Sequence, residues 1–123
     1  EHFDHVGGMA RLQAATGAVL VATPEAAAVL RSGRPGKDDP QAASGHPPFT
    51  PVTGRIDVLT DARRDALRRA GFTAMTTPGH TPGALSWSWR ACEGAGCRTI
   101  VYADSLNPIS ADGFRFSDRP ALV

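Results

Sequence analysis

Apolar residues near the start of the chain follow first a helical and then a strand spacing. Val6, Met9 and Leu12 recur every three residues and Gly17 follows them. This pattern predicts a helix that ends at a glycine C-cap. Residues 18–22 form a short run that is apolar throughout, which is typical of a buried parallel strand.

A second helix is predicted directly after that strand. Thr23-Pro24-Glu25 supplies an N-cap, a proline for the first turn and an acidic residue near the positive helix end, and Gly33 marks the end. Alternating strands and helices indicate the α/β class. Residues 34–54 are rich in Pro, Gly, Asp and Ser, and so long a loop is usually functional or disordered. His46 lies within it, and we expect its side chain to be exposed.

The next two segments have opposite local preferences. Residues 55–60 alternate between polar and apolar positions, as a strand does. Residues 61–71 have the composition of a helix and end at a glycine. Four arginines lie in this second segment, and because the net charge of the chain is low we interpret them as a solvated face.

The last clear pattern predicts a β-hairpin. Residues 72–76 have an extended pattern. Leu85, Trp87 and Trp89 then alternate with polar residues, which predicts a strand with these three side chains on one buried face. Residues 99–103 are expected to pair with that strand.

Length and composition narrow the class of protein. A chain of 123 residues corresponds to one domain or part of one, and 41% hydrophobic with 20% charged residues is ordinary globular usage. Thirteen basic against twelve acidic residues give a net charge of +1, which argues against nucleic acid or a membrane surface as the main partner. The apolar runs have the length of strands, so no transmembrane helix is predicted. Among oligomeric states we favour a monomer.

Metal-binding side chains occur in two motifs. His2, Asp4 and His5 fall within four residues, and His80 lies in the turn Thr-Pro-Gly-His-Thr-Pro-Gly. Imidazole and carboxylate without thiolate suit Zn²⁺, with Mn²⁺ or Fe²⁺ next. Prolines and glycines around His80 hold it rigidly, as a metal ligand requires. A lone His-x-Asp-His is more often a surface segment, but its combination with the second motif favours a metal site.

These motifs resemble a known family. His2-x-Asp4-His5, the loop 78–83 and the strand end 102–106 together resemble the metallo-β-lactamase superfamily, and residues 83–89 resemble its subclass B3. The resemblance implies an αβ/βα sandwich with a dinuclear zinc site at one edge. Residues 1–123 are then expected to be the central part of a single domain, a fragment with the N- and C-terminal portions missing.

The resemblance also implies roles for the metal-binding residues. His2 and His80 would bind one Zn²⁺, and Asp4 and His5 the other. One further histidine ligand for each ion would lie outside residues 1–123. Asp4 would in addition be catalytic, because it would orient the attacking hydroxide and move a proton.

Residues near the last predicted strand are implicated in substrate binding by the same resemblance. Ser105 stands where related subclasses carry a cysteine ligand, but a neutral hydroxyl is a poor zinc ligand, so a contact with substrate is expected instead. Asn107 replaces a serine that helps to hold the substrate carboxylate, and its amide can donate a hydrogen bond. Asp104 bridges the metals in thioester-hydrolysing relatives, whereas we interpret it as structural here.

Two expectations concern the fold and its location. Metallo-β-lactamases have an extended hairpin over residues 61–71, and because tertiary context commonly overrides propensity we favour strands there. Cys92 and Cys97 could be free thiols, a weak zinc clip or a disulfide. Some subclass B3 enzymes carry a disulfide at this loop and are exported, so we expect a periplasmic or secreted protein of a Gram-negative bacterium.

The resemblance implies zinc-dependent hydrolysis of the β-lactam ring of small-molecule antibiotics, and hence antibiotic resistance. In the intact enzyme the attack would come from a hydroxide that bridges two zinc ions. Two alternatives remain. One is a hydrolase of thioesters or lactones on the same scaffold, and the other is an inactive fragment that lacks ligands. We expect residues 1–123 alone to be inactive.

Overall fold

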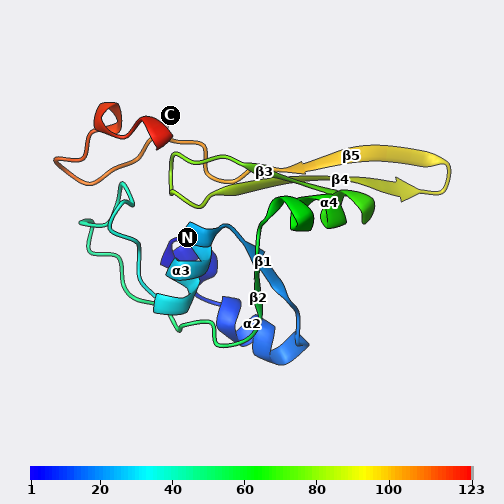
Figure 1. Ribbon diagram of the computed structural model, residues 1–123, viewed down its shortest axis with the longest axis horizontal. Coiled ribbons are helices and arrows are strands. Elements are labelled where there is room, and N and C mark those ends of the chain that lie inside the picture. The colour runs from blue at the N-terminus through cyan, green and yellow to red at the C-terminus, as the bar shows by residue number, and fades with distance from the viewer. Residues whose placement is uncertain (123) are drawn as a thin grey trace.

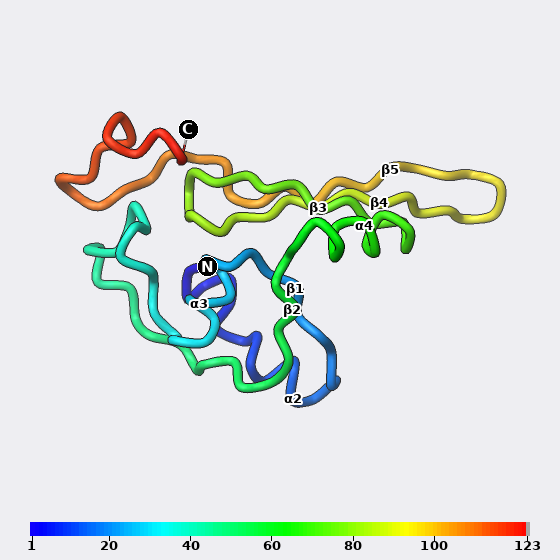
Figure 2. Tube along the Cα trace, viewed as in Figure 1, coloured from blue at the N-terminus to red at the C-terminus, as the bar shows by residue number. Residues whose placement is uncertain are grey.

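The computed structural model describes residues 1–122, which form two sheets with four α-helices (Figure 1). The elements in chain order are α1 (Phe3–Val6), α2 (Met9–Thr16), β1 (Leu20–Ala22), α3 (Pro24–Ser32), β2 (Ile56–Val58), α4 (Asp61–Arg69), β3 (Phe72–Thr76), β4 (Leu85–Glu93), β5 (Gly96–Tyr102), and the 3₁₀ turns η1 (Phe116–Asp118) and η2 (Pro120–Leu122). A parallel pair, β1-β2, lies among helices α1 to α3, and an antiparallel sheet of order β3-β4-β5 lies beside α4 (Figures 1 and 2). No helix among residues 1–122 is both long and apolar enough to cross a membrane.

The first sheet and its crossover helix follow the predicted boundaries. α2 ends on Gly17 and α3 on Gly33, both in the left-handed region with φ of 66° and 71°. The Thr23 side chain accepts a hydrogen bond from the backbone N–H of Ala26, as an N-cap does. β1 then pairs with β2 in parallel, with Leu20 opposite Ile56. The predicted helix–strand–helix–strand order is confirmed.

The long segment after α3 is packed against that helix. Its Phe49 and Val52 belong to the main core, which they share with Ala22, Ala26, Ala27, Val29 and Leu30. Backbone hydrogen bonds join Phe49 to Gly33 and Val52 to Leu30, each at 2.9 Å. Residues 34–54 are therefore packed against α3. Of the two expectations for this loop, functional or disordered, the disordered one is wrong.

The expectation of strands over residues 61–71 is wrong. The chain there forms the helix α4, capped by Thr60, whose side chain accepts a hydrogen bond from the N–H of Arg63. No residue of α4 is buried, so little packing opposes its local helix propensity. Arg63 also pairs with Asp57 of β2 at 3.1 Å, and Arg64 donates to the Ala74 carbonyl of β3 at 2.7 Å. These contacts attach an otherwise exposed helix to both sheets.

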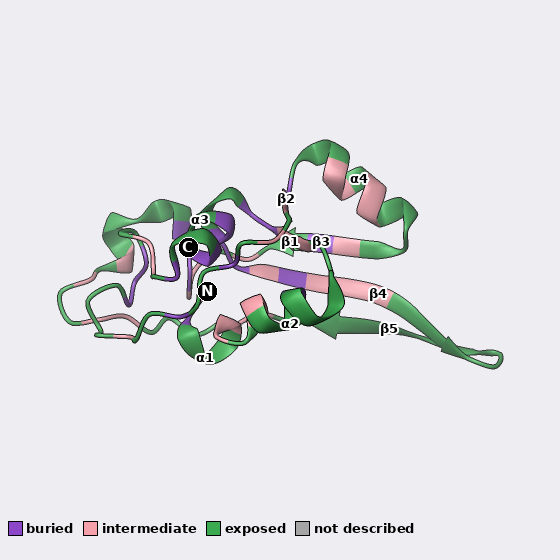
Figure 3. Cartoon of the chain, turned by 90° about the horizontal axis from the view of Figure 1, so that it is seen from below, coloured by how far each residue is buried: buried purple, intermediate pink, exposed green. Residues whose placement is uncertain are grey.

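β4 and β5 form the predicted hairpin, but with a different buried face. Leu85, Trp87 and Trp89 are only half-buried, whereas the intervening Ser86 is 4% exposed. Burial of Ser86 is tolerated because its hydroxyl has two partners. It lies within hydrogen-bond distance of the Thr77 hydroxyl and accepts from the backbone N–H of Asp104, after β5. Figure 3 shows that the hairpin becomes fully exposed towards its tip. The alternation predicted the strand correctly and its buried face incorrectly.

A disulfide joins the two cysteines at the tip of this hairpin. Cys92 and Cys97 lie directly opposite each other in the β4–β5 pairing and are bonded. Of the three alternatives for these cysteines, the structure contains the disulfide, and the zinc clip and the free thiols are wrong.

Thr23 is expected to contribute more to stability than an ordinary N-cap. It is 4% exposed and also donates to the Gly83 carbonyl at 3.0 Å, so Thr23→Val removes a cap and leaves a buried carbonyl without its donor. We expect urea unfolding to show a loss of about 2–3 kcal/mol. Thr60→Val is the matched control, because Thr60 caps an exposed helix and its side chain makes no second hydrogen bond to residues 1–122. A loss of about 1 kcal/mol is expected there. Equal losses would contradict this role of Thr23.

Reduction of the disulfide is expected to destabilise the hairpin by at most about 2 kcal/mol, the chain-entropy value for so short a loop. Cys92→Ser should have the same effect on unfolding in urea, and a reducing agent should not destabilise that variant further. A larger loss on reduction of the variant than of the parent would refute this expectation.

Candidate metal centre

Two of the predicted metal ligands lie side by side although they are far apart in the sequence. His2 is the extended residue before α1 and is 3% exposed, whereas His80 lies in the turn between β3 and β4. Their ring centroids are 5.1 Å apart, with the ring planes at 73°. Gly79 turns the chain next to His80 with φ of 152°, a conformation that favours glycine.

Asp39 fixes the orientation of the His2 ring. Both oxygens of this carboxylate lie at 3.0–3.1 Å from Nε2 of His2, and the Asp39 side chain is fully buried. Burial by itself would raise the pKa of the Asp39 carboxyl, but hydrogen bonds from His2 and from the backbone N–H of Gln41 outweigh it, so this pKa lies below its ordinary value. A charged carboxylate only accepts, so Nε2 of His2 donates and Nδ1 carries the lone pair.

The His80 ring has the opposite tautomer to that of His2. Its Nδ1 lies 3.1 Å from the backbone carbonyl of Asn107, which can only accept, so Nδ1 donates and Nε2 carries the lone pair. Nε2 lies 3.3 Å from the amide nitrogen of Gln41, which donates to it. The Gln41 carbonyl oxygen in turn accepts from Nε2 of His46 at 3.1 Å.

His46 is closer to this site than the sequence predicted. Its ring stacks on that of His2 with centroids 5.0 Å apart and planes at 23°, and the residue is half-buried. The expectation of an exposed side chain is therefore wrong. The reason is that residues 34–54 pack against α3 and return towards the turn that carries His80.

Asp4 and His5 form a separate, exposed pair on α1. The Asp4 carboxylate lies 3.5 Å from Nε2 of His5, and the side chains are 68% and 50% exposed. Within residues 1–122, no three His, Cys, Asp or Glu side chains converge closely enough to hold a metal ion. The structure thus brings His2 and His80 together and leaves Asp4 and His5 as neighbours of each other.

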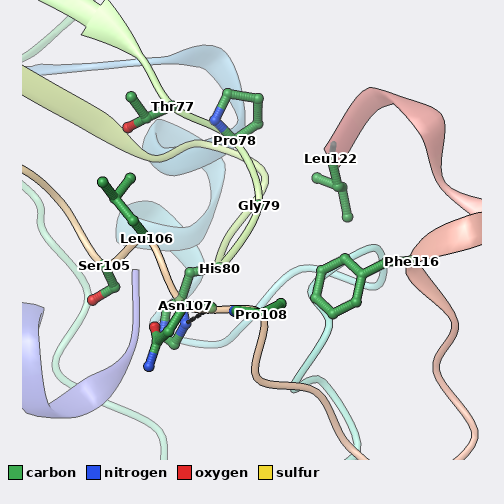
Figure 4. A pocket seen from close by; sticks show the side chains of 10 residues that line it. All are labelled: Thr77, Pro78, Gly79, His80, Ser105, Leu106, Asn107, Pro108, Phe116 and Leu122. Atoms are coloured by element: carbon green, nitrogen blue, oxygen red, sulfur yellow. Dashed lines mark hydrogen bonds between the residues drawn. The ribbon is translucent and has the colours of Figure 1, made fainter.

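The predicted substrate-binding residues share a cavity with His80. Ser105, Asn107 and His80 line a space of about 310 Å³, and Figure 4 shows Phe116 and Leu122 on its other side. The full lining is Thr77, Pro78, Gly79, His80, Ser105, Leu106, Asn107, Pro108, Phe116 and Leu122.

Asp104 fixes the backbone just before the cavity residue Ser105. Its backbone N–H donates to the Ser86 hydroxyl at 3.1 Å, and its carboxylate accepts from the N–H of Ser105 at 2.8 Å. These contacts support the structural interpretation of Asp104 and fix the backbone at Ser105.

Sequence reasoning missed three residues of this region. Asp39 and Gln41 contact the two histidines, but both lie in a loop without periodicity, so only the contacts in space identify them. Glu1 carries no signal in either metal-binding motif. Its carboxylate oxygens are buried next to Thr81 and Gly83, and this burial raises the pKa of the carboxyl group.

Comparison with known proteins gives the family. The family profile described as "Metallo-beta-lactamase superfamily" matches residues 1–93. This chain is a member of the metallo-β-lactamase superfamily, as the motifs predicted, and its fold is a part of the metallo-β-lactamase fold.

Solved structures place it near the B3 enzymes. It is 41% identical to Rm3 metallo-beta-lactamase (TM-score 0.82, 98% of this chain and 44% of that one). It is 50% identical to MIM-2 metallo-beta-lactamase (TM-score 0.78, 99% and 43%). It is 43% identical to MEM-A1, a subclass B3 enzyme isolated from a soil metagenome library (TM-score 0.82, 98% and 45%). The chain therefore spans less than half the length of the structures it matches.

Proposed function

We propose that the domain to which this chain belongs hydrolyses the β-lactam ring of antibiotics with the help of two zinc ions. The observation that carries the proposal is the close approach of His2 and His80, each with one ring nitrogen whose lone pair could bind a metal, beside a cavity lined by Ser105 and Asn107. At His80 the metal would replace the 3.3 Å contact of Nε2 with the Gln41 amide. The similarity to Rm3, MIM-2 and MEM-A1, all metallo-β-lactamases, supports the same substrate class.

The donor set fits zinc. Two imidazoles on one tetrahedral Zn²⁺, with Zn–N distances of about 2.0–2.1 Å, have ring centroids about 5 Å apart, and those of His2 and His80 are 5.1 Å apart. Asp4 and His5 offer a carboxylate and an imidazole in adjacent positions for a second ion. We propose that the remaining ligands come from parts of the domain outside this chain.

The chemistry divides between the metal and the side chains. Bound zinc would act as a Lewis acid and lower the pKa of water from 15.7 to about 7. The exposed Asp4 carboxylate would orient the attacking water, accept its proton and deliver it to the nitrogen released as the ring opens. Ser105 and Asn107 would donate hydrogen bonds to the substrate carboxylate, since both line the cavity with His80.

Two further proposals concern the chain as it stands. We propose that residues 1–123 alone bind zinc weakly and do not turn over substrate, because the described residues supply no cluster of three ligands and metal affinity depends on a complete set. We also propose export to the periplasm and a role in antibiotic resistance. The Cys92–Cys97 disulfide supports export, because disulfides persist in oxidising compartments.

The substrate class can be tested on the full-length domain that contains this segment. We expect turnover of nitrocefin and of a carbapenem, complete loss after treatment with EDTA, and recovery when zinc is added back. S-lactoylglutathione, a thioester, should be hydrolysed much more slowly. Activity that survives chelation, or a preference for the thioester, would overturn the proposal.

His80 is expected to be required for one of the two metals. In the full-length domain, His80→Ala should reduce bound zinc from two ions to one, as measured by elemental analysis, and lower kcat/KM for nitrocefin by about 100-fold or more. His46→Ala is the matched control, because His46 lies next to His2 but belongs to neither metal-binding motif, and it should retain two zinc ions. Unchanged zinc content in the His80 variant would refute its role as a ligand.

A further inference from the structure

Asp39 contacts a predicted ligand from a rigid position. Its backbone N–H bonds to the Gly36 carbonyl at 3.1 Å, and its own carbonyl accepts from Ala42 at 3.0 Å. The next carbonyl, that of Pro40, accepts from the N–H of Ala111 at 2.8 Å, so a second segment also holds this turn. A buried carboxylate held in this way cannot follow the His2 ring if it rotates.

We infer that Asp39 is a positioning residue, which keeps the proton of His2 on Nε2 and so reserves Nδ1 for the metal. The inference rests on the proposed function, because it assigns a task within the same site. A carboxylate that accepts a hydrogen bond from a metal-binding histidine fixes both the tautomer and the ring orientation and raises the basicity of the coordinating nitrogen.

The two histidines are therefore set in opposite tautomers by two different partners. A side-chain carboxylate selects Nδ1 of His2, and a backbone carbonyl, that of Asn107, selects Nε2 of His80. Substitution of Asp39 removes the acceptor at His2, whereas the Asn107 carbonyl that accepts from His80 is present whatever the side chain. The tautomer of His2 is therefore set by the side chain at position 39.

The individual oxygens of Asp39 suggest an isosteric test. Oδ1 accepts from the N–H of Gln41 at 2.7 Å and could still do so as the carbonyl oxygen of an asparagine. Oδ2 lies 3.0 Å from Nε2 of His2, and the amide NH₂ of an asparagine at that place would donate to Nε2. Oδ1 also lies 3.1 Å from Nε2, so an asparagine would place one acceptor and one donor against this nitrogen. Asp39→Asn should thus keep the turn intact while it removes the preference for the proton on Nε2. Asp38→Asn is the matched control, since Asp38 is the adjacent acidic residue and is exposed.

The experiment uses the full-length domain in two states. In the metal-free state, ¹⁵N chemical shifts of the His2 ring report which nitrogen carries the proton. We expect Nε2 in the parent and in Asp38→Asn, and a mixture of the two tautomers in Asp39→Asn. In the second state, competition with a chromophoric chelator measures zinc affinity, which should fall about 10–100-fold in Asp39→Asn and stay within about twofold in Asp38→Asn.

The outcomes separate the inference from the proposed function. An Asp39→Asn domain with the parental tautomer or the parental zinc affinity would overturn the positioning role of Asp39 alone. A parent domain that binds no zinc would refute the proposed function. Circular dichroism and urea unfolding of each variant show whether a lower affinity comes from misfolding. Asp39→Ala, which lacks any acceptor, should also lose the preference for the proton on Nε2.

Discussion

One buried hydrogen bond between the two halves of the molecule underlies the candidate metal centre. The Thr23 hydroxyl caps α3 and at the same time donates to the carbonyl of Gly83, 60 residues further along the chain. This bond ties the turn that carries His80 to the first helix of the βαβ unit, and His2 lies on the same side. Further contacts across the same boundary, among them the one between Gln41 and His80, act together with this bond.

The segment after α3 completes the site from a third direction. Its Phe49 and Val52 are anchored in the core, and this anchoring brings Asp39 and Gln41 against the two histidines. Long segments without regular structure commonly carry functional groups on a rigid scaffold, and here the scaffold is α3 itself. The same arrangement explains why Asp39 can be fully buried and charged, since every oxygen has a donor.

The sequence predicted local structure well where chemistry within a few residues decides it. Thr23 and Gly33 marked the ends of α3 because a cap and a left-handed glycine act through nearby backbone groups. The helix α4 had the same kind of signal in Thr60, but we gave more weight to the family pattern, and on an exposed segment local propensity prevailed. Ser86 was missed as a buried residue because its partners, on two other segments, are invisible to a periodicity argument.

Only the site residues that belong to the two metal-binding motifs could be predicted from the sequence. His2 and His80 were identified from residue types and rigid turns, and the structure brings them together. Asp39 could not be found, because its contact with His2 spans 37 residues and depends on how a loop folds back. The position of His46 beside His2 depends on the same loop.

The disulfide at the hairpin tip has a consequence for the outer strand. β5 is an edge strand with Val101 and Tyr102 exposed, and such edges can slip or recruit a foreign strand. A slip of β5 by one residue would exchange its two faces and turn Val101 to the side that Tyr102 now faces. Because Cys92 is covalently bonded to Cys97 directly opposite, the register of β5 against β4 is fixed in an oxidising environment.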